Sequence, residues 1–162
     1  MELETWHAPP GDRIPNHPRF AVLLYRGGDT TDPAAARALF AEHGWGGSWV
    51  DGVFDFHHFH STSHEALAVV AGSATIELGG PQGRAFSVSA GDVIVLPAGT
   101  GHRRASADAA FTVVGAYPAG QEDYDLLRGD DPGEVAAARE RIANLPAPPQ
   151  DPVGGAGVAG WS

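Results

Sequence analysis

The histidines are the residues of this sequence best suited to form a functional site, because four of the eight lie within eight positions. His57, His58, His60 and His64 stand close together, and Glu65 follows directly. Such a cluster is typical either of polar surface and hydrogen-bonded core histidines or of a metal site. Side chains alternate between the two faces of an extended strand, so His58 and His60 share one face and His57 points away from it. This spacing favours a functional pair.

Two further residues can complete a set of ligands. A turn at residues 61–63 lets Glu65 enter the next strand beside the histidines, and a sharp turn over residues 97–101 leads into His102. Imidazoles and a carboxylate that converge in a folded interior are costly to bury unless a partner satisfies them. A divalent cation is such a partner, and a nitrogen and oxygen set without sulfur suits Fe, Mn, Ni, Co or Zn. The predicted metal ligands are therefore His58, His60, Glu65 and His102.

Other polar residues near these positions leave alternatives open. His64 faces the opposite side from Glu65 on a regular strand, so it is a ligand only if the turn is irregular. His57 is a candidate either to hydrogen-bond to a metal ligand from behind or to lie on the surface. One of Arg103 and Arg104 is expected to point inward, either to bind a carboxylate substrate or as part of a solvated strand end. No tyrosine is singled out by its neighbours, so no catalytic residue is assigned.

The composition excludes several other chemistries. The chain has 162 residues, no cysteine, no lysine and one methionine, which removes thiolate and disulfide chemistry as well as Schiff-base catalysis. A net charge of −10 would repel a phosphate backbone, so we expect no nucleic-acid partner. There is no apolar run long enough for a membrane span, and the acidic N-terminus does not resemble a signal peptide. We therefore expect a cytoplasmic protein.

The elements that must position the histidines are mostly strands. Short β-like runs separated by glycine recur about every 8–12 residues, which is typical of a small antiparallel sandwich or barrel. Predicted strands lie at 48–59, 65–71, 74–79, 84–89, 92–97 and 110–117. A continuous apolar run over residues 19–26 predicts a further strand that is buried on both faces. Most large aromatic residues are expected in the core: Trp49, Phe54, Phe56, Phe86 and Phe111.

Two short helices are predicted beside these strands. Asp32 followed by Pro33 is a typical helix start, and Gly44 is a typical glycine cap, so one helix is expected at 33–43. The second is expected at 133–144, after a proline.

These elements suggest three segments of the chain. Residues 1–18 are predicted to be an irregular N-terminal arm, 19–144 the β-barrel domain with its flanking helices, and 145–162 an extended C-terminal tail that lies on the domain through Trp161. The acidic run at 122–131 is interpreted as a solvated face.

The histidines and the glycines around them resemble the two motifs of the cupin family. The matching residues are Gly52-x5-His58-x-His60-x4-Glu65-x6-Gly72 and Gly91-x5-Pro97-x-Gly99-x2-His102. The second motif usually ends in asparagine, where this chain has Ser106, a turn position rather than a ligand. The wider sequence is similar to single-domain bacterial cupins described as YjlB-like, through His57-His58-Phe59-His60-Ser61, Leu78-Gly79-Gly80-Pro81 and Gly115-Ala116-Tyr117-Pro118.

This resemblance implies an all-β, jelly-roll-like double-stranded β-barrel with two accessory helices, a metal in the barrel mouth and a homodimer. It does not imply one reaction, because cupins include dioxygenases, isomerases, epimerases, decarboxylases and non-catalytic binders. We favour an enzyme that acts on a small organic metabolite at a site of three histidines and one glutamate, with oxygenase-type chemistry first. The alternatives are a non-redox isomerase or lyase, a non-catalytic small-molecule-binding protein, and a zinc-bound accessory subunit.

Overall fold

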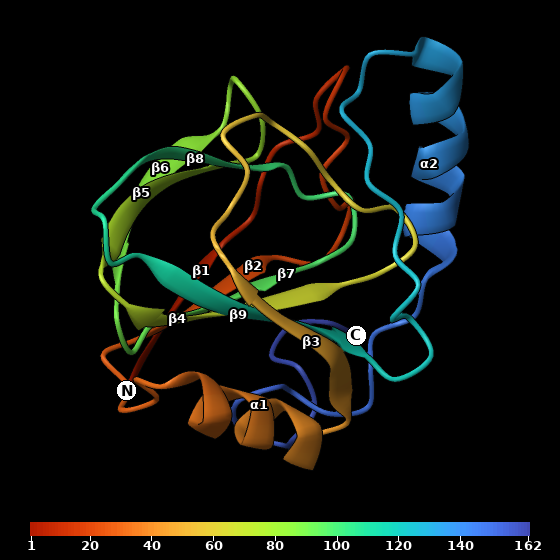
Figure 1. The fold of residues 1–162 in the computed structure, drawn as a ribbon. Helices are drawn as coiled ribbons and strands as arrows, with labels where there is room; N and C mark the ends of the chain where they lie inside the picture. Colours follow the sequence, from red (N-terminus) through yellow and green to blue (C-terminus); the bar gives the residue numbers. More distant parts are fainter.

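The computed structural model describes the whole chain, residues 1–162, as two antiparallel β-sheets that face each other, with two helices outside them (Figure 1). The larger sheet has the strand order β1-β2-β7-β4-β9-β3, and the smaller has the order β6-β5-β8. Strands of the larger sheet are β1 (Glu2–Trp6), β2 (Val22–Arg26), β3 (Trp45–Asp51), β4 (Glu65–Ala71), β7 (Val93–Leu96) and β9 (Thr112–Pro118). Those of the smaller sheet are β5 (Ser73–Leu78), β6 (Arg84–Ser89) and β8 (His102–Ala107). The predicted all-β, jelly-roll-like fold class with two short helices is confirmed.

Strand β4 shows why the sequence of the larger sheet is apolar without alternation. Its residues Ala66 and Ala68 pack into a core on the outer face of the sheet, and Leu67 and Val69 pack into a second core between the two sheets. Both faces of the strand are therefore buried away from solvent, and a continuous apolar run is the expected pattern. Glu65 belongs to the same face as Leu67, so it points into the space between the sheets.

Helix α1 (Pro33–Glu42) covers the outer face of the larger sheet (Figure 1). The side chain of Asp32 accepts a hydrogen bond from the main-chain N–H of Ala35, as expected of an N-cap. Gly44 follows the helix with a φ of 78°, a left-handed conformation that glycine adopts without strain. These local signals explain why the predicted helix at 33–43 agrees so closely with the structure.

Helix α2 (Pro132–Asn144) stands beside the loops at the end of the sheets (Figure 1). Ala138 and Ile142 of this helix pack with Ile14, Phe59 and Ala98 in a small separate core. The helix therefore supports the segment that carries the histidines. Neither helix has the length and apolar character that crossing a bilayer requires.

The C-terminal tail lies on the outer face of the larger sheet. Val158 and Trp161 are buried there together with residues of α1, and the ring of Trp161 stacks on Phe20 at 5.2 Å between centroids. Nearer the start of the tail, the carboxylate of Asp151 accepts a hydrogen bond from the hydroxyl of Tyr25 on β2.

The structure differs from the predicted elements in three places. The strand expected at 48–59 ends at Asp51, and residues 52–57 form no strand. Glu2–Trp6, expected to be irregular, forms β1 because it pairs along its whole length with β2. The segment His102–Ala107 forms β8, which was not predicted as a strand because its polar sequence has no apolar run. It is held by pairing with β5.

Candidate metal centre

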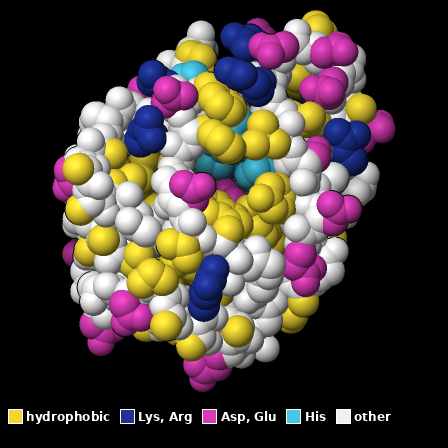
Figure 2. Space-filling view, in the orientation of Figure 1, with side chains coloured by type: hydrophobic (Ala, Val, Ile, Leu, Met, Phe, Trp, Pro, Cys, Tyr) yellow, Lys and Arg dark blue, Asp and Glu magenta, His cyan; other side chains and the backbone are white.

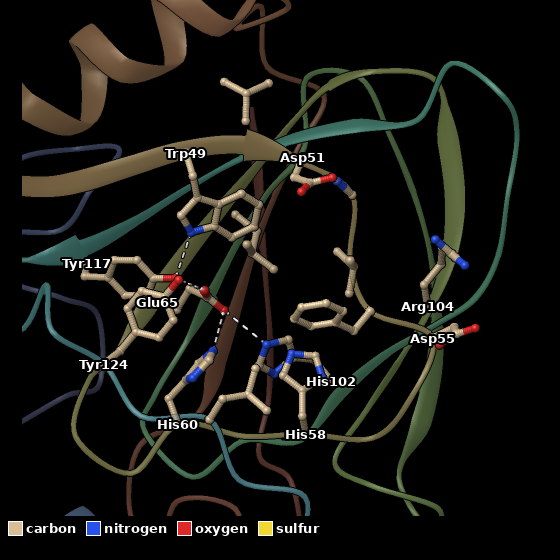
Figure 3. Close-up of a pocket in the computed structure, with 16 residues that line it drawn as sticks. Trp49, Asp51, Asp55, His58, His60, Glu65, His102, Arg104, Tyr117 and Tyr124 are labelled. Atoms are coloured by element: carbon tan, nitrogen blue, oxygen red, sulfur yellow. Dashed lines mark hydrogen bonds and ion pairs between the residues drawn. The ribbon is translucent and has the colours of Figure 1, made fainter.

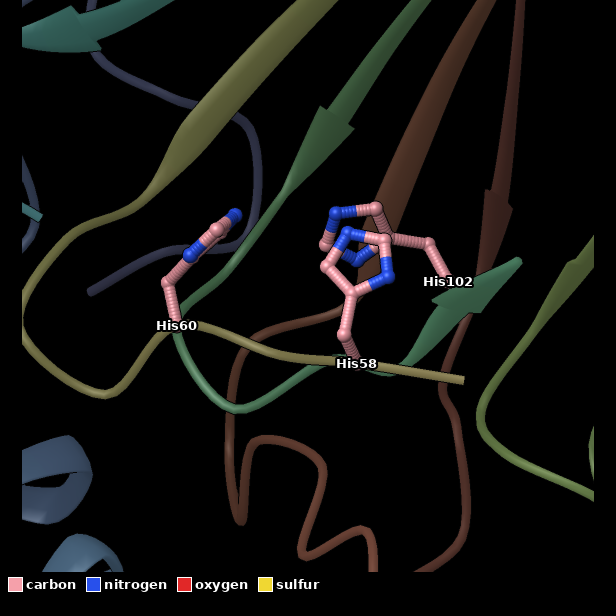
Figure 4. Close-up of side chains that lie close together, drawn as sticks. All are labelled: His58, His60 and His102. Atoms are coloured by element: carbon pink, nitrogen blue, oxygen red, sulfur yellow. The ribbon is translucent and has the colours of Figure 1, made fainter. Parts of the chain in front are cut away.

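Three histidines from two distant segments lie side by side at the open end of the two sheets (Figure 4). His58 and His102 form an isolated antiparallel bridge, in which each main-chain N–H donates to the other residue's carbonyl, at 3.3 and 3.0 Å. The carbonyl of His60 accepts from the N–H of Gly99 at 2.8 Å. One ring nitrogen of each histidine lies within 4.8 Å of those of the other two, and all three residues are buried.

Hydrogen bonds at the rear of each ring determine which nitrogen faces the centre. The Nδ1 atoms of His58 and His102 lie 2.9 and 3.0 Å from the carbonyl oxygens of Phe56 and Thr100. Nδ1 of His60 bonds to the carbonyl oxygen of Asp125 in the same way. A carbonyl oxygen only accepts, so each Nδ1 carries the proton and donates it. In its neutral form, each ring therefore presents the bare lone pair of Nε2 to the centre, which is the form that binds a metal.

Glu65 brings a carboxylate to the same point from strand β4. Its Oε1 lies 3.1 Å from Nε2 of His102 and 3.5 Å from Nε2 of His60 (Figure 3). This oxygen is buried, and while the protons of His60 and His102 are on Nδ1 it accepts no hydrogen bond from the protein. Lone pairs of neutral imidazoles that face a buried, unpartnered carboxylate oxygen fit a cation between them. The donor set of three nitrogens and one oxygen therefore suits a divalent transition metal.

The electrostatics of the centre favour a neutral His58 and an ionised Glu65. Burial, together with the neighbouring His102, lowers the pKa of His58 to about 3, so this ring stays neutral. Burial disfavours the charged forms of His60 and Glu65, but their mutual attraction outweighs it. As a result the pKa of His60 is raised and that of Glu65 lies well below its usual value, so the carboxylate is ionised.

A chain of hydrogen bonds holds Glu65 in place from behind (Figure 3). The hydroxyl of Tyr117 donates to Oε2 of Glu65 at 2.7 Å, and Nε1–H of Trp49 donates to the Tyr117 hydroxyl at 2.8 Å. The indole can reach this position because Gly115 has no side chain: a Cβ there would lie 2.3 Å from the Trp49 ring. Neither residue was predicted to support the site: Trp49 was expected only in the core, and no tyrosine was singled out.

Asp125 anchors the loop that carries the histidines, so the interpretation of residues 122–131 as merely a solvated face is wrong at this position. Its carboxylate accepts from the main-chain N–H groups and hydroxyls of Ser61 and Thr62. Although partial burial opposes it, these donors lower the pKa of Asp125. The same residue supplies the carbonyl that orients His60.

The other two histidines of the cluster lie away from the centre. His64 is fully buried with both ring nitrogens engaged: Nδ1 accepts from the N–H of Ala98, and Nε2 donates to the carbonyl of Pro146. Burial lowers its pKa to about 4, in keeping with a neutral core histidine. His57 points to Glu77, at 3.6 Å between Nε2 and Oε2. The geometry therefore separates these two from His58, His60 and His102.

A cavity of about 640 Å³ opens directly above the centre. In the space-filling view the histidines form the floor of a hollow whose walls are largely hydrophobic (Figure 2). Tyr117 and Tyr124 stack in its wall at 4.1 Å between ring centroids. Phe54 also lines the cavity and is 54% exposed, so its predicted place in the core is wrong. It lies outside because the strand expected at 48–59 has already ended at this position.

Comparison with known proteins finds one matching family profile and one curated relative of similar length. A family profile described as "Cupin domain" matches residues 49–114, the part of the chain that holds all four predicted ligands. The chain is 40% identical to "Uncharacterized protein YjlB" of Bacillus subtilis (strain 168) over 154 residues, which is 95% of this chain and 92% of that protein.

Solved structures resemble the chain more distantly. An acireductone dioxygenase from Bacillus anthracis, with a cadmium ion in its active centre, is 16% identical over 74% of this chain and 78% of its own, with a TM-score of 0.42. A DUF861 family protein from Thermotoga maritima is 17% identical over 58% of this chain and 96% of its own, with a TM-score of 0.38.

Proposed function

Because the chain belongs to the cupin family, we propose that it binds one divalent transition metal through His58, His60, Glu65 and His102 and acts there on a small organic metabolite. One observation carries this proposal: the Nδ1–H groups of three buried imidazoles are all used by carbonyls, so their Nε2 lone pairs converge beside the unpartnered Oε1 of Glu65. Without a bound ion, the three Nε2 lone pairs and Oε1 of Glu65 are hydrogen-bond acceptors that face one another. A cation between them would give all four a partner.

The metal would supply Lewis acidity, or activation of dioxygen if it is iron. The protein contributes a fixed carboxylate, because Tyr117 and Trp49 hold Glu65 from behind. Burial and the Glu65 carboxylate raise the pKa of Tyr117, so this hydroxyl keeps its proton and remains a donor. The hydrophobic half of the cavity lining would shield the apolar part of a bound substrate from water.

Within this proposal we favour oxygenase-type chemistry over non-redox isomerase or lyase chemistry. A six-coordinate ion with four protein ligands leaves two positions for small molecules, which suffices for dioxygen beside a substrate. The two reaction types differ in a simple measurement. An oxygenase consumes dissolved oxygen when its substrate is added, whereas an isomerase or lyase turns over equally well under nitrogen.

Metal content measured by elemental analysis tests the site itself. We expect about one transition-metal ion per chain after dialysis, for the unchanged protein and for His57→Ala. The control variant removes a neighbouring imidazole that faces Glu77 instead of the centre. His58→Ala and His102→Ala are expected to lose the metal. Equal metal content in His58→Ala and His57→Ala, or a metal-free unchanged protein after growth and refolding with each candidate metal, would refute the proposal.

A further inference from the structure

The guanidinium of Arg104 lines the cavity above the histidines without a protein partner (Figure 3). It is half-buried, and its side chain forms no hydrogen bond, ion pair or stacking contact with an aromatic ring. Most other arginines are engaged. Arg13, Arg26 and Arg141, for example, pair with carboxylates. A partly desolvated cation with nothing to bind is costly unless a ligand supplies the opposite charge.

Strand β8 places this charge on the same side as the metal centre. His102 and Arg104 are two residues apart on β8, so both point into the cavity, about 7 Å apart along the strand. Arg103 lies between them and points to the other side, where it donates to the carboxylate of Glu77 and the carbonyl of Asp55. The strand alternation therefore resolves the choice left open by the sequence: Arg104 faces the cavity and Arg103 does not.

The other residues that line the cavity indicate what the rest of the ligand is made of. Half of the lining residues are hydrophobic, among them Trp49, Phe54 and Leu126. Asp51 and Asp55 line the mouth, but both are exposed and neither pairs with Arg104. Apart from the histidines of the metal site, Arg104 is the only cationic side chain in the lining. The lining also holds the carboxylates of Asp51, Asp55 and Glu65, which repel a doubly charged phosphate more strongly than a ligand with one negative charge.

We propose that Arg104 anchors the substrate, and that the substrate is a small organic acid with an apolar, aromatic or branched body. Its carboxylate pairs with the guanidinium in the two-pronged geometry that arginine favours. Its body lies against the apolar wall, and its far end faces His58, His60 and His102. This inference rests on the proposed function for the identity of the site, but the Arg104 contact itself needs no metal.

Binding of matched probes by calorimetry tests the inference. The probes are 3-phenylpropanoate, its uncharged amide and phenyl phosphate, titrated into the full chain after zinc loading and again after chelator treatment. We expect the acid to bind about tenfold or more tightly than the amide, because only the acid forms a charge-assisted pair. Arg104→Gln is expected to abolish this preference, and Arg103→Gln, the matched loss of one neighbouring charge outside the cavity, is expected to retain it.

A measurement on the unchanged protein guards against a variant that fails to fold. The Nε–H signal of Arg104 in a ¹⁵N-resolved NMR spectrum is expected to shift on addition of the acid and not of the amide. Equal affinity for acid and amide, an unaltered preference in folded Arg104→Gln, or tighter binding of phenyl phosphate than of the acid would overturn the inference.

The two proposals fail separately. If no metal binds but the chelator-treated protein still prefers the acid, the metal site is refuted and the role of Arg104 stands. If the metal binds and the preference is absent, the metal site stands and the role of Arg104 is refuted.

Discussion

Removal of one hydroxyl, in Tyr117→Phe, is expected to weaken metal binding without altering any proposed ligand. The Tyr117 hydroxyl is the only donor to Oε2 of Glu65, at 2.7 Å, and it also accepts from Nε1–H of Trp49. Without it, a buried carboxylate oxygen and the half-buried indole N–H of Trp49 both lose their partner. The carboxylate then takes up a proton or turns toward His60, and a metal must reverse that change before it can bind.

The magnitude follows from the kind of hydrogen bond that is lost. A hydrogen bond to a charged group contributes about 1.5–3 kcal/mol, and every 1.4 kcal/mol corresponds to about a tenfold change in affinity. We therefore expect Tyr117→Phe to bind zinc about 10–100-fold more weakly, which is the range known for residues that orient metal ligands from behind.

The assay is competition for zinc against a chromophoric chelator, with Tyr25→Phe as control. Tyr25 also donates to a buried carboxylate, Oδ2 of Asp151, at 2.6 Å, but at the far side of the sheet. Both variants lose the same group from the same type of bond, so both should unfold at lower urea concentration. Only Tyr117→Phe should lose zinc affinity. Zinc affinity of Tyr117→Phe equal to or above that of Tyr25→Phe would refute the reasoning.

Two further predictions concern stability. Burial, with His64 nearby, lowers the pKa of His17 from 6.5 to about 3, so the unfolded chain binds a proton that the folded chain does not, and stability falls as the pH falls through this window. His17→Asn keeps an acceptor for the two main-chain N–H groups at this turn and should remove about 2 kcal/mol of the stability loss between pH 7 and pH 4. An unchanged loss in urea unfolding at the two pH values would contradict this origin. Gly99 has a φ of 88° and a Cβ there would lie 2.7 Å from Cδ1 of Ile142, whereas Gly120, with a φ of 89°, has open space around it. Gly99→Ala should therefore cost about 2–4 kcal/mol and Gly120→Ala about 1 kcal/mol, and equal losses in urea unfolding would show that packing at Gly99 is unimportant.

Sequence and structure agree most closely where a signal is local. The helix predicted at 33–43 depended on Asp32, Pro33 and Gly44, and these residues act on the backbone next to them. The apolar run of β4 was recognisable for a similar reason, because a strand that is buried on both faces needs apolar residues at nearly every position.

The structure also brings the four predicted ligands together, but by a different route from the one expected. The alternation of a regular strand was the reason for placing His58 and His60 on one side, yet residues 52–57 form no strand. Instead, the bridge between His58 and His102 and the bond from Gly99 to the carbonyl of His60 direct the rings to one point. The spacing was informative because it belongs to a recurring motif, not because the segment is extended throughout.

Residue types and short spacings were enough to predict the class of fold, the two helices and the four side chains that we propose as metal ligands, because such local patterns carry that information. Only the tertiary structure decided which atoms face the centre, and that Tyr117, Trp49 and Asp125 support it. The same holds for the choice of Arg104 over Arg103. These contacts join positions about 50 to 70 residues apart, and no local preference of the backbone encodes which distant side chain will complete a hydrogen bond.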